Sequence, residues 1–118
     1  MSRFVRSLDE LDEAIGSLRR ELDGLEASVA HTRDAVSAGM RMTDLFPTSD
    51  APRARDAVID AMNTLHSVLM RSRGEYFHVL VDEEGLTISE VARLVGHPRQ
   101  LVKRRYDAVR PTRDESRA

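Results

Sequence analysis

A heptad of apolar and small residues runs through the first third of the chain, with alternating spacings of three and four from Leu8 to Gly39. So narrow a stripe is typical of a helix that pairs with another helix along one seam, and not of a helix that covers a broad core. The sequence therefore predicts a long, coiled-coil-like N-terminal helix. The residues expected to form a dimer seam are Leu8, Leu11, Ile15, Leu18, Leu22, Leu25 and Val29.

The start and the partner of this helix are less closely defined. Ser7 and Glu10 have the spacing of a capping box, which predicts a helix start near Leu8. The seam has two possible partners, a second copy of the chain or the next helix of the same chain. We favour the second copy, because the following helix is too short to cover the whole leucine seam.

Charged residues beside the seam bear on the direction of pairing. In an antiparallel pair centred near residues 23–24, Asp12 would face Arg33 of the second copy and Arg19 would face Glu26. A parallel pair would bring like charges together instead. Exposed ion pairs contribute only about 0.2–1 kcal/mol each, so the charges favour an antiparallel pair without deciding the matter.

A middle helix follows a loop. Two prolines and three small polar residues within 46–52 predict a connection and a new helix start. Arg73 followed by Gly74 is typical of a helix C-terminus, so we expect this helix to end there and a short helix to occupy 75–82. The apolar face of the middle helix consists of Val58, Met62, Leu65 and Leu69.

The stretch 85–110 predicts two short helices joined by a tight turn. Thr87 and Glu90 form a second capping box, Gly96 stands where the chain must turn sharply, and Pro98 suits the first turn of the next helix. The side chains that we expect to face inward are Val91, Leu94, Val95, Leu101, Val102, Tyr106 and Val109.

Positive charge is concentrated on the second of these helices, although the whole chain has a net charge of −2. Arginine and lysine contact guanine edges or phosphates, and glutamine pairs with adenine. Helical phase places Arg105 near the buried side. The residues that we expect to contact DNA are Arg99, Gln100, Lys103 and Arg104, together with Arg93 and Thr87.

This segment resembles region four of sigma factors and the LuxR-type module, over about 30 of the 118 residues. The resemblance implies a helix-turn-helix at 86–110 that binds double-stranded DNA, with the same four outward residues of the second helix facing the duplex. His97-Pro98 stands where those families have an aliphatic and a small residue. The matching positions are Glu90-Val91-Ala92, Leu94, Gly96 and Leu101-Val102-Lys103. No family is recognised for the N-terminal part.

Several other classes of protein do not fit the sequence. The chain has no cysteine, and its four histidines do not follow a metal-ligand spacing. It also has no phosphate-binding loop and no Ser/His/Asp arrangement, so we expect neither an enzyme nor a cofactor. No apolar run approaches the roughly 20 residues that span a bilayer, and we expect a cytoplasmic protein.

We thus expect an all-α protein with a helical dimerisation segment at 1–46, a helical domain at 50–110 and a disordered tail at 111–118. The predicted function is sequence-specific DNA binding by a small dimeric transcriptional regulator. Two alternatives remain: an adaptor that contacts RNA polymerase or another regulator, and a nucleoid-type binder without sequence preference.

Overall fold

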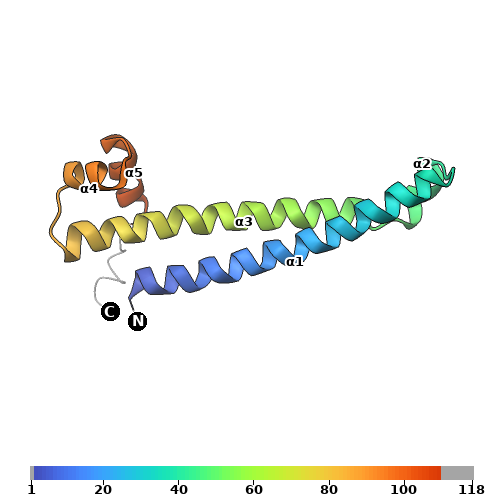
Figure 1. The fold of residues 1–118 in the computed structure, drawn as a ribbon. Helices are drawn as coiled ribbons and strands as arrows, with labels where there is room; N and C mark the ends of the chain where they lie inside the picture. Colours follow the sequence, from blue (N-terminus) through green and yellow to red (C-terminus); the bar gives the residue numbers. More distant parts are fainter. Residues whose placement is uncertain (1, 110–118) are drawn as a thin grey trace. The chain divides into compact units, whose positions relative to one another are not determined.

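A computed structural model describes residues 2–109, and this part of the chain contains helices and no strand, which confirms the all-α prediction (Figure 1). None of its helices is long and apolar enough to cross a membrane. The predicted tail at 111–118 lies outside the described residues. The elements are α1 (Arg3–Ser37), α2 (Met42–Leu45), the 3-10 turn η1 (Phe46–Thr48), α3 (Ala51–His78), the π-helical turn η2 (Val79–Glu83), α4 (Ile88–Val95) and α5 (Arg99–Ala108).

The chain divides into two compact units. The hairpin unit is Asp12–His66, and the terminal unit combines Met1–Leu11 with Ser67–Ala118. Residues 46–50, where the sequence predicts the boundary between two segments, form the connection between α2 and α3 inside the hairpin unit. The terminal unit draws on both ends of the chain because side chains near the start of α1 contact the last turns of α3.

In the hairpin unit, α1 lies against α3 of the same chain, and α2 and η1 connect the two helices. The buried positions of α3 include Val58 and Ala61, one turn apart. On α1 the buried or half-buried positions of this unit are mostly small residues and leucines of the heptad. They are Ala14, Ile15, Gly16, Ser17, Leu18, Glu21, Leu25, Ser28, Thr32 and Ala35.

This packing divides the predicted dimer seam. Leu11, Ile15, Leu18 and Leu25 are half-buried, whereas Leu8, Leu22 and Val29 are more than 40% exposed. Small side chains beside the half-buried leucines allow α3 to approach α1 on that side. The exposed residues of the seam therefore lie at the edge of the contact between α1 and α3. The sequence favoured a second copy over the next helix as the partner, but the structure uses the next helix, α3, for one half of the seam.

The first helix starts at Arg3, earlier than the predicted start at Leu8. Ser2 precedes it, and the Ser2 hydroxyl accepts a hydrogen bond from the backbone N–H of Val5 (3.1 Å). Ser7, the predicted cap, lies inside the helix and is buried. The capping prediction at Ser7 was therefore wrong, because contacts with α3 stabilise the additional N-terminal turn.

The middle helix passes through Gly74 and continues to His78, so the predicted helix end at Gly74 and the separate helix at 75–82 are wrong. Gly74 is buried inside α3. A Cβ atom there would lie 2.4 Å from Cγ2 of Val109 and 2.7 Å from the carbonyl oxygen of Arg105. The glycine thus serves the close approach of α5 to α3, and not a helix terminus.

The core of the terminal unit joins three helices. Phe77 of α3, Val91 of α4 and Val102 of α5 have no exposed surface, and Ala92 is buried beside them. Placement of Val91 and Val102 on the inner faces confirms that part of the sequence prediction. The half-buried side chains around this core are Tyr76, Leu80, Val81, Leu86, Ile88, Val95 and Tyr106.

One predicted core residue lies outside. Leu94 is 65% exposed. The inner face of α4 is centred among Val91, Ala92 and Val95, and at 100° per residue Leu94 lies about 110° from that centre. The prediction was wrong because an eight-residue helix has room for only one narrow buried face.

Candidate nucleic-acid interface

The start of α4 is fixed by the predicted capping box, which the structure confirms. The Thr87 hydroxyl accepts from the backbone N–H of Glu90 (3.1 Å), and the backbone N–H of Thr87 donates to the Glu90 carboxylate (3.0 Å). Two N–H groups that the helix cannot satisfy by itself are therefore bonded. Thr87, one of the residues expected to contact DNA, already uses its hydroxyl oxygen in this cap.

The cap also changes the acidity of Glu90. Its carboxylate accepts the backbone N–H of Thr87 and, with a smaller effect, interacts with the Thr87 hydroxyl, and these bonds hold the pKa of Glu90 below its ordinary value of 4.5. Because the folded state has the lower pKa, the ionised cap stabilises the fold above about pH 4.5. That stability is lost as the pH falls through the folded-state pKa.

We therefore expect Glu90→Gln to make the unfolding free energy less dependent on pH as the pH falls below about 4.5. The amide oxygen of glutamine can still accept the Thr87 N–H, but it carries no titrating charge. Urea unfolding at a series of pH values, followed by circular dichroism, measures the effect. Parallel pH profiles for the variant and the parent protein would contradict it.

The turn between α4 and α5 depends on Gly96. This residue has φ +73° and ψ +32°, in the left-handed region that side chains disfavour. The N–H groups of Gly96 and His97 both donate to the carbonyl oxygen of Ala92 (3.0 and 3.1 Å), which ends α4 tightly. Pro98 then precedes the first residue of α5. The predicted turn residue is confirmed, with the conformation expected of it.

The outward face of α5 is basic and polar. It lies opposite Val102, which is completely buried, so the core contact fixes which side of α5 faces solvent. The guanidinium Nε of Arg99 donates to the Ser89 hydroxyl (3.1 Å), and Lys103 pairs with Asp107 at 2.9 Å. Asp107 and Ala108 are exposed on α5 as well. The four other exposed residues of α5, called here the α5 basic face, are Arg99, Gln100, Lys103 and Arg104.

The other two expected contact residues lie elsewhere. Arg93 is exposed in the last turn of α4, and Thr87 caps the opposite end of that helix. The structure thus brings together four of the six residues on α5. Arg105 is half-buried, as its helical phase predicted, and its Nε has no hydrogen-bond partner among the described residues.

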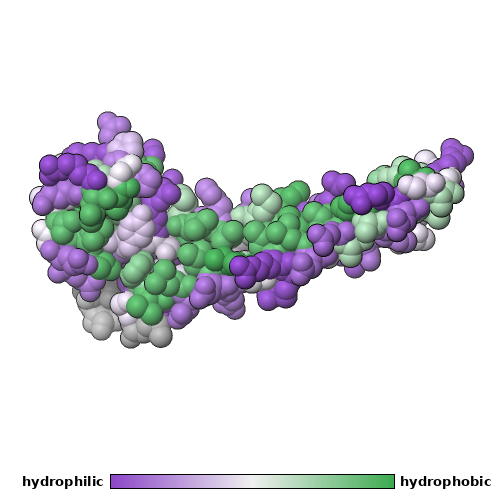
Figure 2. Space-filling view, viewed as in Figure 1, coloured by the Kyte–Doolittle hydropathy of each residue, from purple (hydrophilic) through white to green (hydrophobic). Residues whose placement is uncertain are grey.

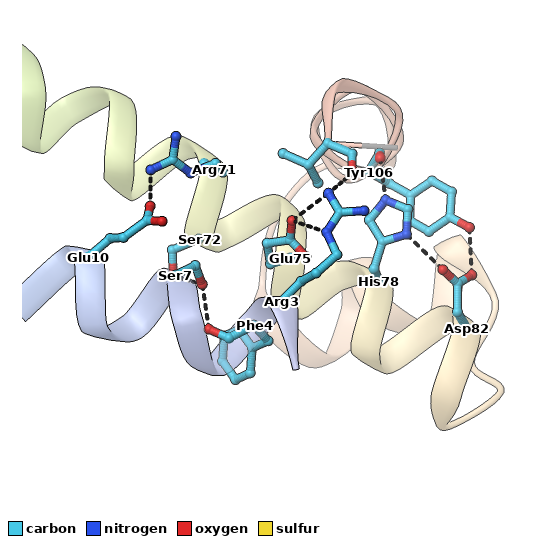
Figure 3. Close-up of polar contacts among 11 residues, drawn as sticks. Arg3, Phe4, Ser7, Glu10, Arg71, Ser72, Glu75, His78, Asp82 and Tyr106 are labelled. Atoms are coloured by element: carbon cyan, nitrogen blue, oxygen red, sulfur yellow. Dashed lines mark hydrogen bonds and ion pairs between the residues drawn. The ribbon is translucent and has the colours of Figure 1, made fainter. Parts of the chain in front are cut away.

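A cluster that sequence reasoning did not find attaches α5 to the end of α3 (Figure 3). The His78 ring stacks on the Tyr106 ring with centroids 3.9 Å apart. Its Nδ1 lies 2.7 Å from the Asp82 carboxylate, and its Nε2 lies 2.7 Å from the carbonyl oxygen of Tyr106. The Tyr106 hydroxyl donates to the other oxygen of Asp82 (2.6 Å). The spacing of His78 and Asp82 was visible in the sequence, but no local signal pointed to Tyr106.

The same cluster lowers the pKa of Asp82. Partial desolvation acts to raise it, but the hydrogen bonds from Tyr106 and His78, together with the charge interaction with His78, outweigh desolvation. The pKa of Asp82 therefore lies below its ordinary value of 3.8. Asp82 thus remains ionised through the range in which proteins are usually studied, and keeps both hydrogen bonds.

A second missed contact, the Arg3 clamp, holds the end of α5 (Figure 3). Arg3 Nη2 lies 2.8 Å from the carboxylate of Glu75, whose side chain is only 8% exposed, and donates to the carbonyl oxygen of Val109 (3.0 Å). Phe4 packs edge-on against Tyr76 beside it, with ring centroids 6.3 Å apart. The first turn of α1 therefore helps to position α5.

Comparisons with known proteins give no relative from which a function could be transferred. No family model, no curated protein and no solved structure matches the chain. Among residues 2–109, no three histidine, aspartate or glutamate side chains are grouped so that they could hold a metal ion.

Proposed function

We propose that the chain binds double-stranded DNA in a sequence-specific manner through a helix-turn-helix formed by α4 and α5, and acts as a small dimeric regulator of transcription. The observation that supports this most directly is the α5 basic face. It is exposed, and the capped α4, the Gly96 turn and the buried Val102 fix how α5 presents it. A major-groove reader needs such a preset helix.

The residue types on this face suit both parts of DNA recognition. Arg99, Lys103 and Arg104 can neutralise phosphates or contact guanine, and Gln100 can form two hydrogen bonds with adenine. Lys103 would exchange its bond with Asp107 for a contact with DNA. That exchange costs little, since the ion pair is about half exposed and such pairs are weak.

Selection from a pool of random duplexes, followed by sequencing and a salt titration of the enriched duplex, tests the proposal. We expect an enriched motif, bound with an affinity that falls steeply as salt rises. Salt-sensitive binding without enrichment would favour a nucleoid-type binder. Absence of binding at low salt would contradict the proposal.

Single substitutions on α5 locate the interface. We expect Lys103→Ala and Arg104→Ala each to weaken binding of the selected duplex by about fivefold or more, and to reduce the salt dependence by about one unit of slope where a phosphate contact is lost. Arg53→Ala is the matched control, because it removes the same charge as Arg104→Ala from an 85% exposed side chain in the hairpin unit. Fluorescence anisotropy measures all three. An equal loss in the control would mean that only net charge matters.

The exposed Leu94 supports a second candidate, a protein-binding helix-turn-helix. The Leu94 side chain is large, apolar and 65% exposed on α4, so it suits a contact with a protein better than a contact with a phosphate. This candidate predicts a stable complex with a protein, such as RNA polymerase or another regulator, that Leu94→Glu abolishes. It also predicts little DNA binding at moderate salt. Under the first proposal, Leu94→Glu leaves the α5 basic face intact, and DNA binding is retained.

A further inference from the structure

An apolar face is exposed along the hairpin unit, beside the contact between its helices. Leu22, Val29 and Val36 of α1 and Ile59 and Met62 of α3 are each between 41% and 54% exposed. Figure 2 shows apolar side chains gathered along these helices and bordered by polar ones. Single exposed apolar residues are ordinary, but a contiguous face of them marks an interaction surface.

The two helices contribute to the same side of the hairpin. Ile15 follows the buried Ala14 by one position on α1, and Met62 follows the buried Ala61 by one position on α3. Two antiparallel helices are related by an approximate two-fold axis perpendicular to their common plane, so equivalent positions point to the same side. In agreement, Arg55, one heptad before Met62, lines a single hollow of about 380 Å³ together with residues of α1.

We propose that a second copy of this chain covers this apolar face, with the two α1 helices antiparallel and Leu22 at the two-fold axis. The row of apolar residues on α1 fits itself in that arrangement. Ile15 and Val29 are equally far from Leu22 in opposite directions, so each meets the other in the second copy. The dimer is then a four-helix bundle, in which each chain already supplies a folded pair of helices.

Charges identify the occupant as a second copy. Asp12, Arg19, Glu26 and Arg33 are exposed on the edge of the same face. Their signs reverse about Leu22, so an antiparallel dimer brings Asp12 within about one residue of the level of Arg33, and Arg19 within about one residue of the level of Glu26, twice each by symmetry. In a parallel dimer, each of these charged residues would instead lie at the same level as its own copy, so that like charges would be neighbours. Arg33 and Arg55 line the hollow at the end that would receive the acidic Asp12 of the second copy.

This inference extends the proposed function, which needs two copies, but it is tested without DNA, so that either proposal can fail alone. Because the chain has no cysteine, single cysteines report on the geometry. We expect Leu22→Cys to form a disulfide-linked dimer on mild oxidation. Val29→Cys alone should remain unlinked, and a mixture of Ile15→Cys and Val29→Cys should form linked pairs. Gly24→Cys, exposed and directed away from this face, is the control and should remain unlinked.

Charge reversal tests the orientation independently. Arg33→Asp should weaken dimerisation at least tenfold in sedimentation equilibrium, and Asp12→Arg in the same chain should restore it. Arg20→Asp, an exposed change of equal charge outside this face, should leave dimerisation unaltered. Circular dichroism verifies that each variant retains its helices. A monomer at all concentrations up to about 1 mM, or self-linking of Val29→Cys without linking in the mixture, would overturn the proposal.

Discussion

Gly74→Ala is expected to destabilise the terminal unit by about 1–3 kcal/mol, the range found when extra atoms are forced into a packed site. Alanine is the better helix former by about 1 kcal/mol, so helix propensity alone predicts the opposite sign. At Gly74, however, the new Cβ would lie 2.4 Å from Val109 and 2.7 Å from the carbonyl oxygen of Arg105. A backbone oxygen cannot move aside as a flexible side chain can, so α5 must shift.

Gly24→Ala is the matched control for that substitution. Gly24 also lies inside a helix, but a Cβ there would have no atom within 4 Å. It should therefore stabilise the protein by about 0.5–1 kcal/mol. Chemical denaturation of both variants gives the two free energies. Stabilisation by both would show that α5 does not pack closely on α3. Since α5 carries the basic face, Gly74→Ala should also weaken DNA binding, and Gly24→Ala should not.

Arg3→Met is expected to cost about 3 kcal/mol of unfolding free energy. The substitution leaves the carboxylate of Glu75, which is only 8% exposed, without its cation, and breaking a buried ion pair typically costs about 3–5 kcal/mol. Arg3 is itself 34% exposed, and solvent screening places the effect at the lower end of that range. The lost bond to Val109 adds to the effect and loosens the end of α5.

Two further variants separate the ion pair from other effects of the substitution. Arg6→Met removes an exposed arginine from the same helix and should change the unfolding free energy by less than about 0.5 kcal/mol. Adding Glu75→Leu to Arg3→Met removes the unpaired charge and should recover most of the loss. Thermal or urea unfolding of the three proteins is sufficient. A loss in Arg6→Met equal to that in Arg3→Met would contradict the buried pair as the cause.

Features set by residues close together in the chain were predicted from the sequence. The capping box of Thr87 and Glu90 and the turn at Gly96 each depend on contacts within a few residues, so their sequence pattern suffices. The burial of Val102 follows from helical periodicity once the helix is assigned. The exposure of Gln100, Lys103 and Arg104 follows in the same way, since the helical repeat turns them away from Val102. Arg99 is exposed as the first residue of α5.

Features that depend on distant residues were not predicted. Gly74 after Arg73 has the appearance of a helix end, and only the contact with Val109 shows why the helix continues through it. Ser7 has the spacing of a cap, but its burial against α3 places it inside α1. In both cases a small residue that is typical of a terminus instead permits two helices to approach, and local sequence cannot distinguish these uses.

By itself, the sequence determined that the chain is helical, where α4 and α5 meet, and which side of α5 is basic, because these properties depend on periodicity and on neighbours along the chain. The tertiary structure decided which half of the α1 seam contacts α3, and how Arg3, Glu75 and Tyr106 hold α5 in place. A heptad specifies that a helix needs a partner, but the partner is selected by the shape and the distance of surfaces far apart in sequence. Only the folded chain brings those surfaces together.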